Sequence, residues 1–165
     1  MTQKTLFSRY LKDLKPGTLI WIGLRPGRKQ DMVSVDSVLA IKSLGLEGDH
    51  RCAKTPGSAR QVTIISEEFI DLIARYSGHA TIDPALLRRN LVVRGVNLNA
   101  LRHQCFQIGG ALFEATALCH PCSRMDRALG QGGAAAMLGY GGLCARILQS
   151  GTISVGDKLI PLMDE

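Results

Sequence analysis

Apolar residues along the chain come in short runs that are rich in β-branched side chains and are separated by glycine, proline, asparagine or aspartate. Runs of this length and composition are typical of β-strands. Two adjacent glycines, Gly109 and Gly110, predict a turn inside one of them. We predict strands within residues 17–24, 32–42, 60–65, 90–95, 105–118, 143–148 and 152–162.

Helical periodicity is clear in one segment, residues 66–78. Ser66 is a suitable N-cap, two glutamates follow it, and Gly78 is a typical stop signal. The side chains expected to face the core are Phe69, Ile70, Ile73 and Ala74. Shorter helices are predicted within residues 83–90, where Pro84 suits the first turn, and within residues 122–130.

The many short strands and the 18 glycines favour a closed or curved β fold with a few short helices. A length of 165 residues predicts one domain, residues 1–165. The first residues lack the apolar core of a signal peptide, and no uncharged apolar run is long enough to cross a bilayer. We therefore expect a cytoplasmic protein that does not enter a membrane.

Charge is distributed unevenly along the chain, whose formal net charge is +6. Residues 85–113 contain no carboxylate but hold four arginines: Arg88, Arg89, Arg94 and Arg102. A solvated basic face is the simpler interpretation, and a bound anion is the other. Aromatic residues make up only 5% of the chain, and no basic and aromatic platform is visible, which argues against nucleic acid as a partner.

Five cysteines, an odd number, indicate free thiols rather than a disulfide framework. Cys119 and Cys122 have the spacing of zinc and dithiol redox motifs. The chain has no second ligand pair for zinc and no alternation of strands and helices for a redox fold. Cys105 and Cys144 lie in apolar strand patterns, so we expect them to be buried and inert.

Cys122 differs from the other cysteines because it precedes a predicted helix and has Arg124 and Arg127 nearby. A helix start and positive charge both stabilise a thiolate. A thiolate at this position is a nucleophile or a ligand for a soft metal.

Two glycine-rich segments are further candidates. Residues 45–51, GLEGDHR, contain Asp49 and His50, each of which is a candidate general acid, ligand or turn former; a structural turn is the simpler interpretation of Asp49. Residues 139–148, GYGGLCARIL, can offer backbone N–H groups to an anion or can form a simple barrel turn. The chain has neither a Walker sequence nor a dinucleotide fingerprint.

The order of these motifs, GLEGD, RQVTII, RRNLVV, PCSRM and GGLCARIL, resembles the MOSC domain, named for the C-terminal domain of molybdenum cofactor sulfurases. The resemblance covers about residues 16–160. It implies a β-barrel and a cleft that binds the molybdenum–pterin cofactor, or handles sulfur for it, through a cysteine. The family cysteine maps onto Cys122, with Cys119 as an additional thiol that could take the role.

The resemblance also implies how the cofactor would be held. A soft thiolate suits molybdenum, and guanidinium and N–H groups suit a phosphate. The expected cofactor-binding residues are Arg60, Arg88, Arg89, Asn90, Cys119, Arg124, Gly141, Gly142 and Arg146. Asp49 and His50 are candidates for proton delivery. His50 departs from relatives that read GDRH, which puts its equivalence in doubt.

By analogy with small MOSC proteins, the expected activity is reduction of N-hydroxylated compounds of the hydroxylaminopurine or amidoxime type. The sequence shows no iron–sulfur pattern and no flavin fingerprint, so electrons are expected from a separate donor protein. Two alternatives stay open. One is a sulfur carrier or cofactor chaperone with a persulfide on Cys122, and the other is a binding barrel without catalysis.

Overall fold

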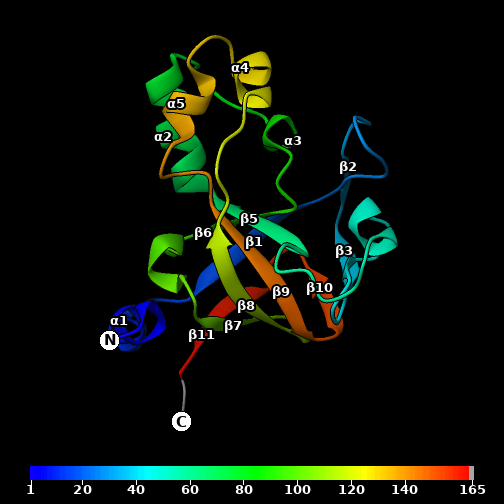
Figure 1. Ribbon diagram of the computed structural model, residues 1–165, viewed down its shortest axis with the longest axis vertical. Coiled ribbons are helices and arrows are strands. Elements are labelled where there is room, and N and C mark those ends of the chain that lie inside the picture. The colour runs from blue at the N-terminus through cyan, green and yellow to red at the C-terminus, as the bar shows by residue number, and fades with distance from the viewer. Residues whose placement is uncertain (164–165) are drawn as a thin grey trace.

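Seven strands close into a mixed β-barrel, as the computed structural model shows for residues 1–163, the part of the chain that is described here (Figure 1). The order around the barrel is β11-β7-β8-β9-β5-β6-β1, and pairing between β1 and β11 closes the ring. Only β5 and β6 pair in parallel within this ring. The strands are β1 (Gly17–Leu24), β5 (Val62–Ser66), β6 (Leu91–Arg94), β7 (Cys105–Ile108), β8 (Ala111–Leu118), β9 (Leu143–Gln149) and β11 (Lys158–Leu162).

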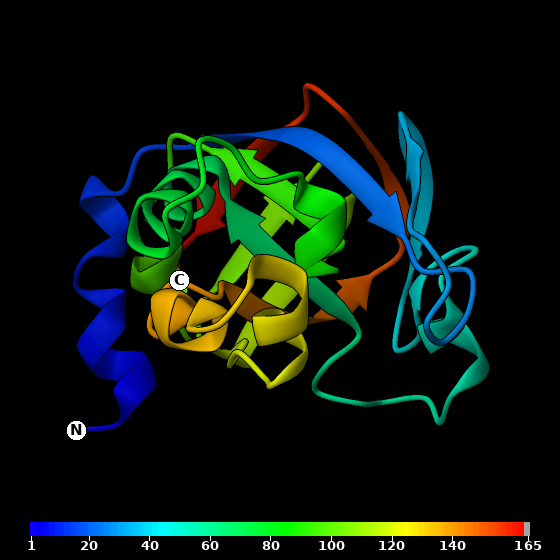
Figure 2. The same ribbon diagram turned by 90° about the horizontal axis from the view of Figure 1, so that it is seen from above.

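A smaller sheet lies beside the barrel (Figure 2). It contains β3 (Ser37–Ile41), β4 (Gly45–Leu46) and β10 (Gly151–Ser154) in the order β10-β3-β4. The short strand β2 (Val33–Val35) extends the barrel sheet from β1. The loop after β1 and the turn after β4 lie side by side, since the backbone N–H of His50 donates to the Arg25 carbonyl at 2.8 Å.

The barrel interior is filled by alternate side chains of its strands, as the period of two along a strand requires. Phe106 on β7 and Phe113 on β8 are fully buried, and their rings stack with centroids 5.4 Å apart. Leu19, Ile64 and Leu143 are also fully buried in the same core. These buried residues stabilise the barrel, and the connecting loops extend from its strands.

Most of the helices gather over one end of the barrel, whereas the helix at the N-terminus lies apart from them (Figure 1). The longest is α2 (Glu67–Ser77), where the Ser66 hydroxyl accepts a hydrogen bond from the Phe69 amide and Gly78 ends the helix at φ 77°. The others are α1 (Gln3–Ser8), α3 (Pro84–Leu87), α4 (Arg124–Leu129) and α5 (Gly133–Met137), with 3-10 turns η1 (Leu11–Asp13), η2 (His50–Ala53) and η3 (Leu98–Leu101).

The predicted mainly β barrel with a few short helices is confirmed, and each predicted strand segment contains at least one strand. Residues 32–42 and 152–162 each form two strands, because β3 and β10 leave the barrel for the small sheet. The helix predicted within 83–90 ends at Leu87, since Arg88 adopts a left-handed conformation. In the described residues, no helix is long and apolar enough to cross a membrane.

Candidate functional site

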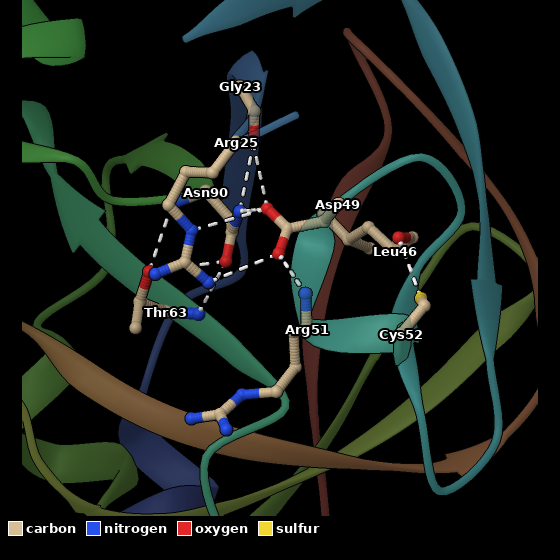
Figure 3. A network of polar contacts seen from close by, with 8 residues as sticks. All are labelled: Gly23, Arg25, Leu46, Asp49, Arg51, Cys52, Thr63 and Asn90. Carbon is tan, nitrogen blue, oxygen red and sulfur yellow. Dashed lines mark hydrogen bonds and ion pairs between the residues drawn. The ribbon is translucent and has the colours of Figure 1, made fainter. Parts of the chain in front are cut away.

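Asp49 is the centre of a buried polar network that joins three separate segments (Figure 3). Its carboxylate accepts hydrogen bonds from the backbone N–H of Arg25 at 2.9 Å, from Asn90 Nδ2 at 2.9 Å and from the backbone N–H of Arg51 at 3.0 Å. The Arg25 guanidinium also pairs with it at 3.2 Å. This network connects the end of β1, the start of η2 and the residue before β6.

Burial raises the pKa of Asp49, but the hydrogen bonds from Arg25 and from the backbone of Arg25 and Arg51 outweigh it and leave the pKa lowered. The carboxylate is thus ionised at neutral pH and fully occupied by donors. This arrangement favours the structural role of Asp49 over proton delivery, which stays a prediction.

Asn90 supports the same network from the other side. Its amide nitrogen also donates to the carbonyl of Gly23 at 3.0 Å, and its amide oxygen accepts from the Thr63 backbone N–H at 3.2 Å. The amide nitrogen and the amide oxygen of Asn90 therefore both have hydrogen-bond partners within the protein. Its predicted contact with a cofactor stays a prediction.

His50 follows Asp49 in η2, and its backbone N–H donates to the Arg25 carbonyl at 2.8 Å. Burial lowers the pKa of His50, Asp49 raises it, and the charge of Arg25 lowers it further, with a lowered pKa as the result. The imidazole is therefore neutral at pH 7 and is suited to accept a proton.

Cys119 stands at the end of β8, where its backbone N–H donates to the carbonyl of Gly142 at 2.8 Å. A hydrogen bond from the Cys144 thiol, and after it the charges of Arg89 and Arg60, lower the pKa of Cys119 to about 6 although burial opposes this. The same contact and burial raise the pKa of Cys144. At neutral pH the pair is a thiolate and its thiol donor.

Arg89 is buried, and one of its nitrogens lacks a partner. Its Nε donates to the Gly141 carbonyl at 2.9 Å and its Nη1 to the Leu87 carbonyl at 3.0 Å, whereas Nη2 makes no hydrogen bond within the described residues. A buried cationic donor without a partner is costly. An anionic ligand near Gly141 would satisfy it.

Gly141 and Gly142 allow the loop before β9 to lie directly against other backbone segments. A Cβ atom at Gly141 would come within 2.2 Å of the Cys119 carbonyl oxygen, and one at Gly142, at φ 88°, within 1.9 Å of the Ile64 carbonyl oxygen. No larger residue fits at either position. Beside this loop lies a cavity of about 190 Å³, lined by Leu118, Cys119, His120, Pro121, Leu138, Gly139, Gly141 and Gly142.

Cys122 is exposed, and its carbonyl accepts the Met125 amide at 2.9 Å as α4 begins. In sequence, Cys122 follows Pro121, which lines the cavity beside Cys119, and precedes Arg124, which lines a second, basic cleft. This cleft has a volume of about 510 Å³ and is lined by Arg28, Lys29, Arg88, Arg124, Arg127 and Ala128. Arg88 lines this cleft, whereas Arg89, its neighbour in sequence, contacts the glycine loop at Gly141.

The two remaining predicted arginines lie on the β8–β9 side of the site. Arg60 is exposed and its charge reaches Cys119, while Arg146 pairs with Glu114 at 3.6 Å. In the described part of the chain, no three His, Cys, Asp or Glu residues cluster as a metal site. Arg60 is therefore placed near the thiolate, and Arg146 already has a carboxylate partner.

Sequence reasoning missed three parts of this site. Arg25 was not singled out, although it directly follows a predicted strand, which is a common place for a functional side chain. Arg28 and Lys29 were not singled out either, although both line the basic cleft. Cys144 is buried as predicted, but it is the hydrogen-bond donor to Cys119 rather than an inert residue.

Comparison with known proteins gives one family and a consistent fold. The family model described as the MOSC domain matches residues 48–160. The YuaD protein from Bacillus subtilis superposes with a TM-score of 0.75 at 18% identity, over 88% of this chain and 95% of that chain. No curated protein matches the chain.

Two further crystal structures show the same fold. YiiM from Escherichia coli has a TM-score of 0.69 at 20% identity and matches 90% of this chain and 71% of its own. YiiM from Geobacillus stearothermophilus has a TM-score of 0.70 at 16% identity and matches 88% of this chain and 75% of its own. These identities are low, so the likeness concerns the fold.

Proposed function

Because the chain belongs to the MOSC domain family, we propose that it binds the molybdenum–pterin cofactor and reduces N-hydroxylated compounds with it. The observation that carries this proposal is that the charge of Arg89 reaches the Cys119 thiolate while Arg89 Nη2 has no hydrogen-bond partner of its own. A soft metal prefers a thiolate ligand, and an anionic group prefers a buried arginine. Cys119 and Arg89 together therefore fit a ligand that carries both a soft metal and an anionic group.

The metal ligand comes from the segment that contains Cys119 and Cys122. Cys122 is exposed and can reach a bulky group, while Cys119 is the thiol with the lowered pKa. Arg89 would bind the anionic part of the group through Nη2, next to Gly141. When bound, the cofactor would supply the two-electron removal of oxygen from an N–OH group.

The protein's own residues would position groups in the site and transfer protons. Asn90 donates to the Asp49 carboxylate, which in turn holds Arg25 in place, and neutral His50 can accept or pass on a proton. Reduction of R–NHOH to R–NH2 and water takes two electrons and two protons. We propose that the electrons come from a separate donor protein, because the sequence carries no motif for a second redox group.

The test is molybdenum retention by protein made in a cofactor-producing host. The Cys119→Ser/Cys122→Ser double variant should lose the metal, since a hydroxyl is a poor soft-metal ligand. The two single variants then assign the ligand. Cys52→Ser is the matched control, because Cys52 donates to the Leu46 carbonyl in another part of the fold. Metal content equal to the parent in the double variant contradicts thiolate ligation.

One observation favours a second function, sulfur transfer. A thiolate with a pKa of about 6 is a ready nucleophile. In this alternative the thiolate attacks the outer sulfur of a donor protein's persulfide, gains that sulfur, and releases the donor as a thiolate. Intact-mass analysis that finds 32 Da added on Cys119 or Cys122, in protein that turns over no N–OH compound, would favour the carrier.

A further inference from the structure

Five cations surround the basic cleft, and they come from three separate parts of the chain. Arg28 and Lys29 belong to the loop after β1, whereas Arg88 follows α3, and Arg124 and Arg127 lie on α4. No carboxylate is among the residues that line this cleft of about 510 Å³. The fold therefore concentrates most of its excess positive charge in one place.

Within residues 1–163, none of these cations forms an ion pair. In residues 1–163 the ion pairs are those of Arg25 with Asp49 and of Arg146 with Glu114, and neither involves a cation of the cleft. Burial, followed by the charges of Arg25 and Arg124, lowers the pKa of Arg88, and this outweighs the opposing effects of Asp49 and Asp31. Like charges held together cost free energy that a bound anion would recover.

The cleft is also preorganised. Arg88 Nη1 donates to the Gln30 carbonyl at 2.6 Å and so ties the wall beside α3 to the loop after β1. Arg88 at φ 55° and Lys29 at φ 63° both adopt the left-handed conformation, which costs about 1–2 kcal/mol for residues with a Cβ atom. Unfavourable backbone conformations of this kind concentrate at ligand sites.

We propose that this cleft binds the phosphate of the substrate, so that the protein acts on N-hydroxylated nucleotides in preference to free bases. Guanidinium groups bind a phosphate monoester dianion through paired N–H donors, and several of them converge here. The part of the inference that concerns the base and its N–OH group rests on the proposed function. The part that concerns the phosphate rests on the cleft alone.

Position supports a nucleotide rather than a free phosphate. Cys122 is two residues before Arg124, so their Cα atoms are at most about 7 Å apart. A ligand with its phosphate in the cleft can therefore extend toward the thiols. The cofactor's own phosphate has a different candidate partner, the free Nη2 of Arg89 beside Gly141. Arg88 and Arg124 are thereby assigned to the substrate instead of the cofactor.

The test uses the full chain without cofactor, made in a host that cannot synthesise it. Calorimetry compares adenosine 5′-monophosphate with adenosine, since the nucleotide is the product expected from a 6-hydroxylaminopurine nucleotide. The nucleotide should bind at least about tenfold more tightly, a difference of about 1.4 kcal/mol. Its affinity should also fall as salt rises, because exposed charges are screened.

Two variants remove one guanidinium each, Arg124→Gln and Arg127→Gln. Each should weaken nucleotide binding by about tenfold and leave adenosine binding unchanged. Arg75→Gln, an exposed arginine of α2, is the matched control and should bind like the parent. Thermal melts of all variants check that they are folded.

Equal affinity for nucleotide and nucleoside overturns the inference, as does nucleotide binding that survives both variants. A third arm loads the protein with cofactor. If loading blocks nucleotide binding and Arg124→Gln lowers molybdenum retention, the cleft belongs to the cofactor phosphate and the inference is wrong. None of these outcomes affects the thiolate test, so failure of the cleft and failure of the proposed function are distinguishable.

Discussion

The Cys144 thiol donates a hydrogen bond to the sulfur of Cys119, and the two residues come from neighbouring strands of the barrel. The Cys119 thiol therefore loses its proton more readily than a free thiol, and the Cys144 thiol loses it less readily. This relationship gives the site a thiolate near neutral pH, without a histidine to accept the proton.

The first prediction concerns the reactivity of Cys119. Its alkylation by iodoacetamide should rise with pH around a midpoint of about 6, because only the thiolate reacts. Cys144→Ala should move the midpoint upward, since it removes the hydrogen-bond donor, and Cys144→Ser should move it less. Mass spectrometry of the peptide that contains Cys119 measures this. A parent midpoint near that of a free thiol, about 8.5, contradicts the prediction.

Arg89 should act on the same thiol. Arg89→Met removes the cation that lowers the pKa of Cys119, so the alkylation midpoint should rise. The variant should also retain less molybdenum, because the partner for the anionic part is lost. Arg94→Met, at an exposed position of β6, is the control and should leave both values unchanged. An unchanged midpoint in Arg89→Met would show that the charge of Arg89 does not lower the pKa of Cys119.

Asp49→Asn should destabilise the fold by about 3 kcal/mol in urea unfolding, because it breaks a largely buried ion pair and leaves Arg25 unmatched. Asp71→Asn, at an exposed position of α2, should change stability by less than about 0.5 kcal/mol. Normal stability combined with lost turnover in Asp49→Asn would instead support proton delivery.

The same carboxylate should leave a signature in acid. Since the pKa of Asp49 is lowered on folding, its contribution to stability is full above the unfolded value of 3.8 and is lost as pH falls through the lower folded pKa. The difference in unfolding free energy between the parent and Asp49→Asn should therefore shrink below about pH 4. A constant difference from pH 7 to pH 2 would contradict the sign of this shift.

Gly142→Ala tests the close approach of the glycine loop. Both the left-handed backbone and the contact with the Ile64 carbonyl oppose a Cβ atom, so a loss of more than about 2 kcal/mol is expected. Gly78 has a left-handed φ of 77° with open space around it, so Gly78→Ala should lose only the backbone contribution, about 1 kcal/mol. Equal losses in the two variants would mean that the loop can move away from Ile64.

The sequence determined the elements whose signals are local. The strand at Gly17–Leu24 has the predicted bounds, because its short apolar run lies between Pro16 and the polar turn that begins at Arg25. The helix Glu67–Ser77 also has its predicted caps at Ser66 and Gly78. Helix α5 was missed, because a run of glycine and alanine carries no amphipathic pattern.

The motif order was sufficient to indicate the family, which the family model over residues 48–160 confirms. It could not rank the two thiols of the CxxC segment. The lowered pKa of Cys119 depends on Cys144, which is 25 positions further along the chain, and on Arg89.

Only the tertiary structure decided which partners each charged residue has. Asp49 and Arg25 are 24 positions apart and meet because β1 and η2 emerge side by side, which turns a candidate acid into a buried ion pair. Arg88 and Arg89 are neighbours in sequence, but the left-handed backbone at Arg88 accompanies their separation into the basic cleft and the glycine loop. Hydrogen bonds and charges act through space, so these roles follow from the closure of the barrel and not from spacing along the chain.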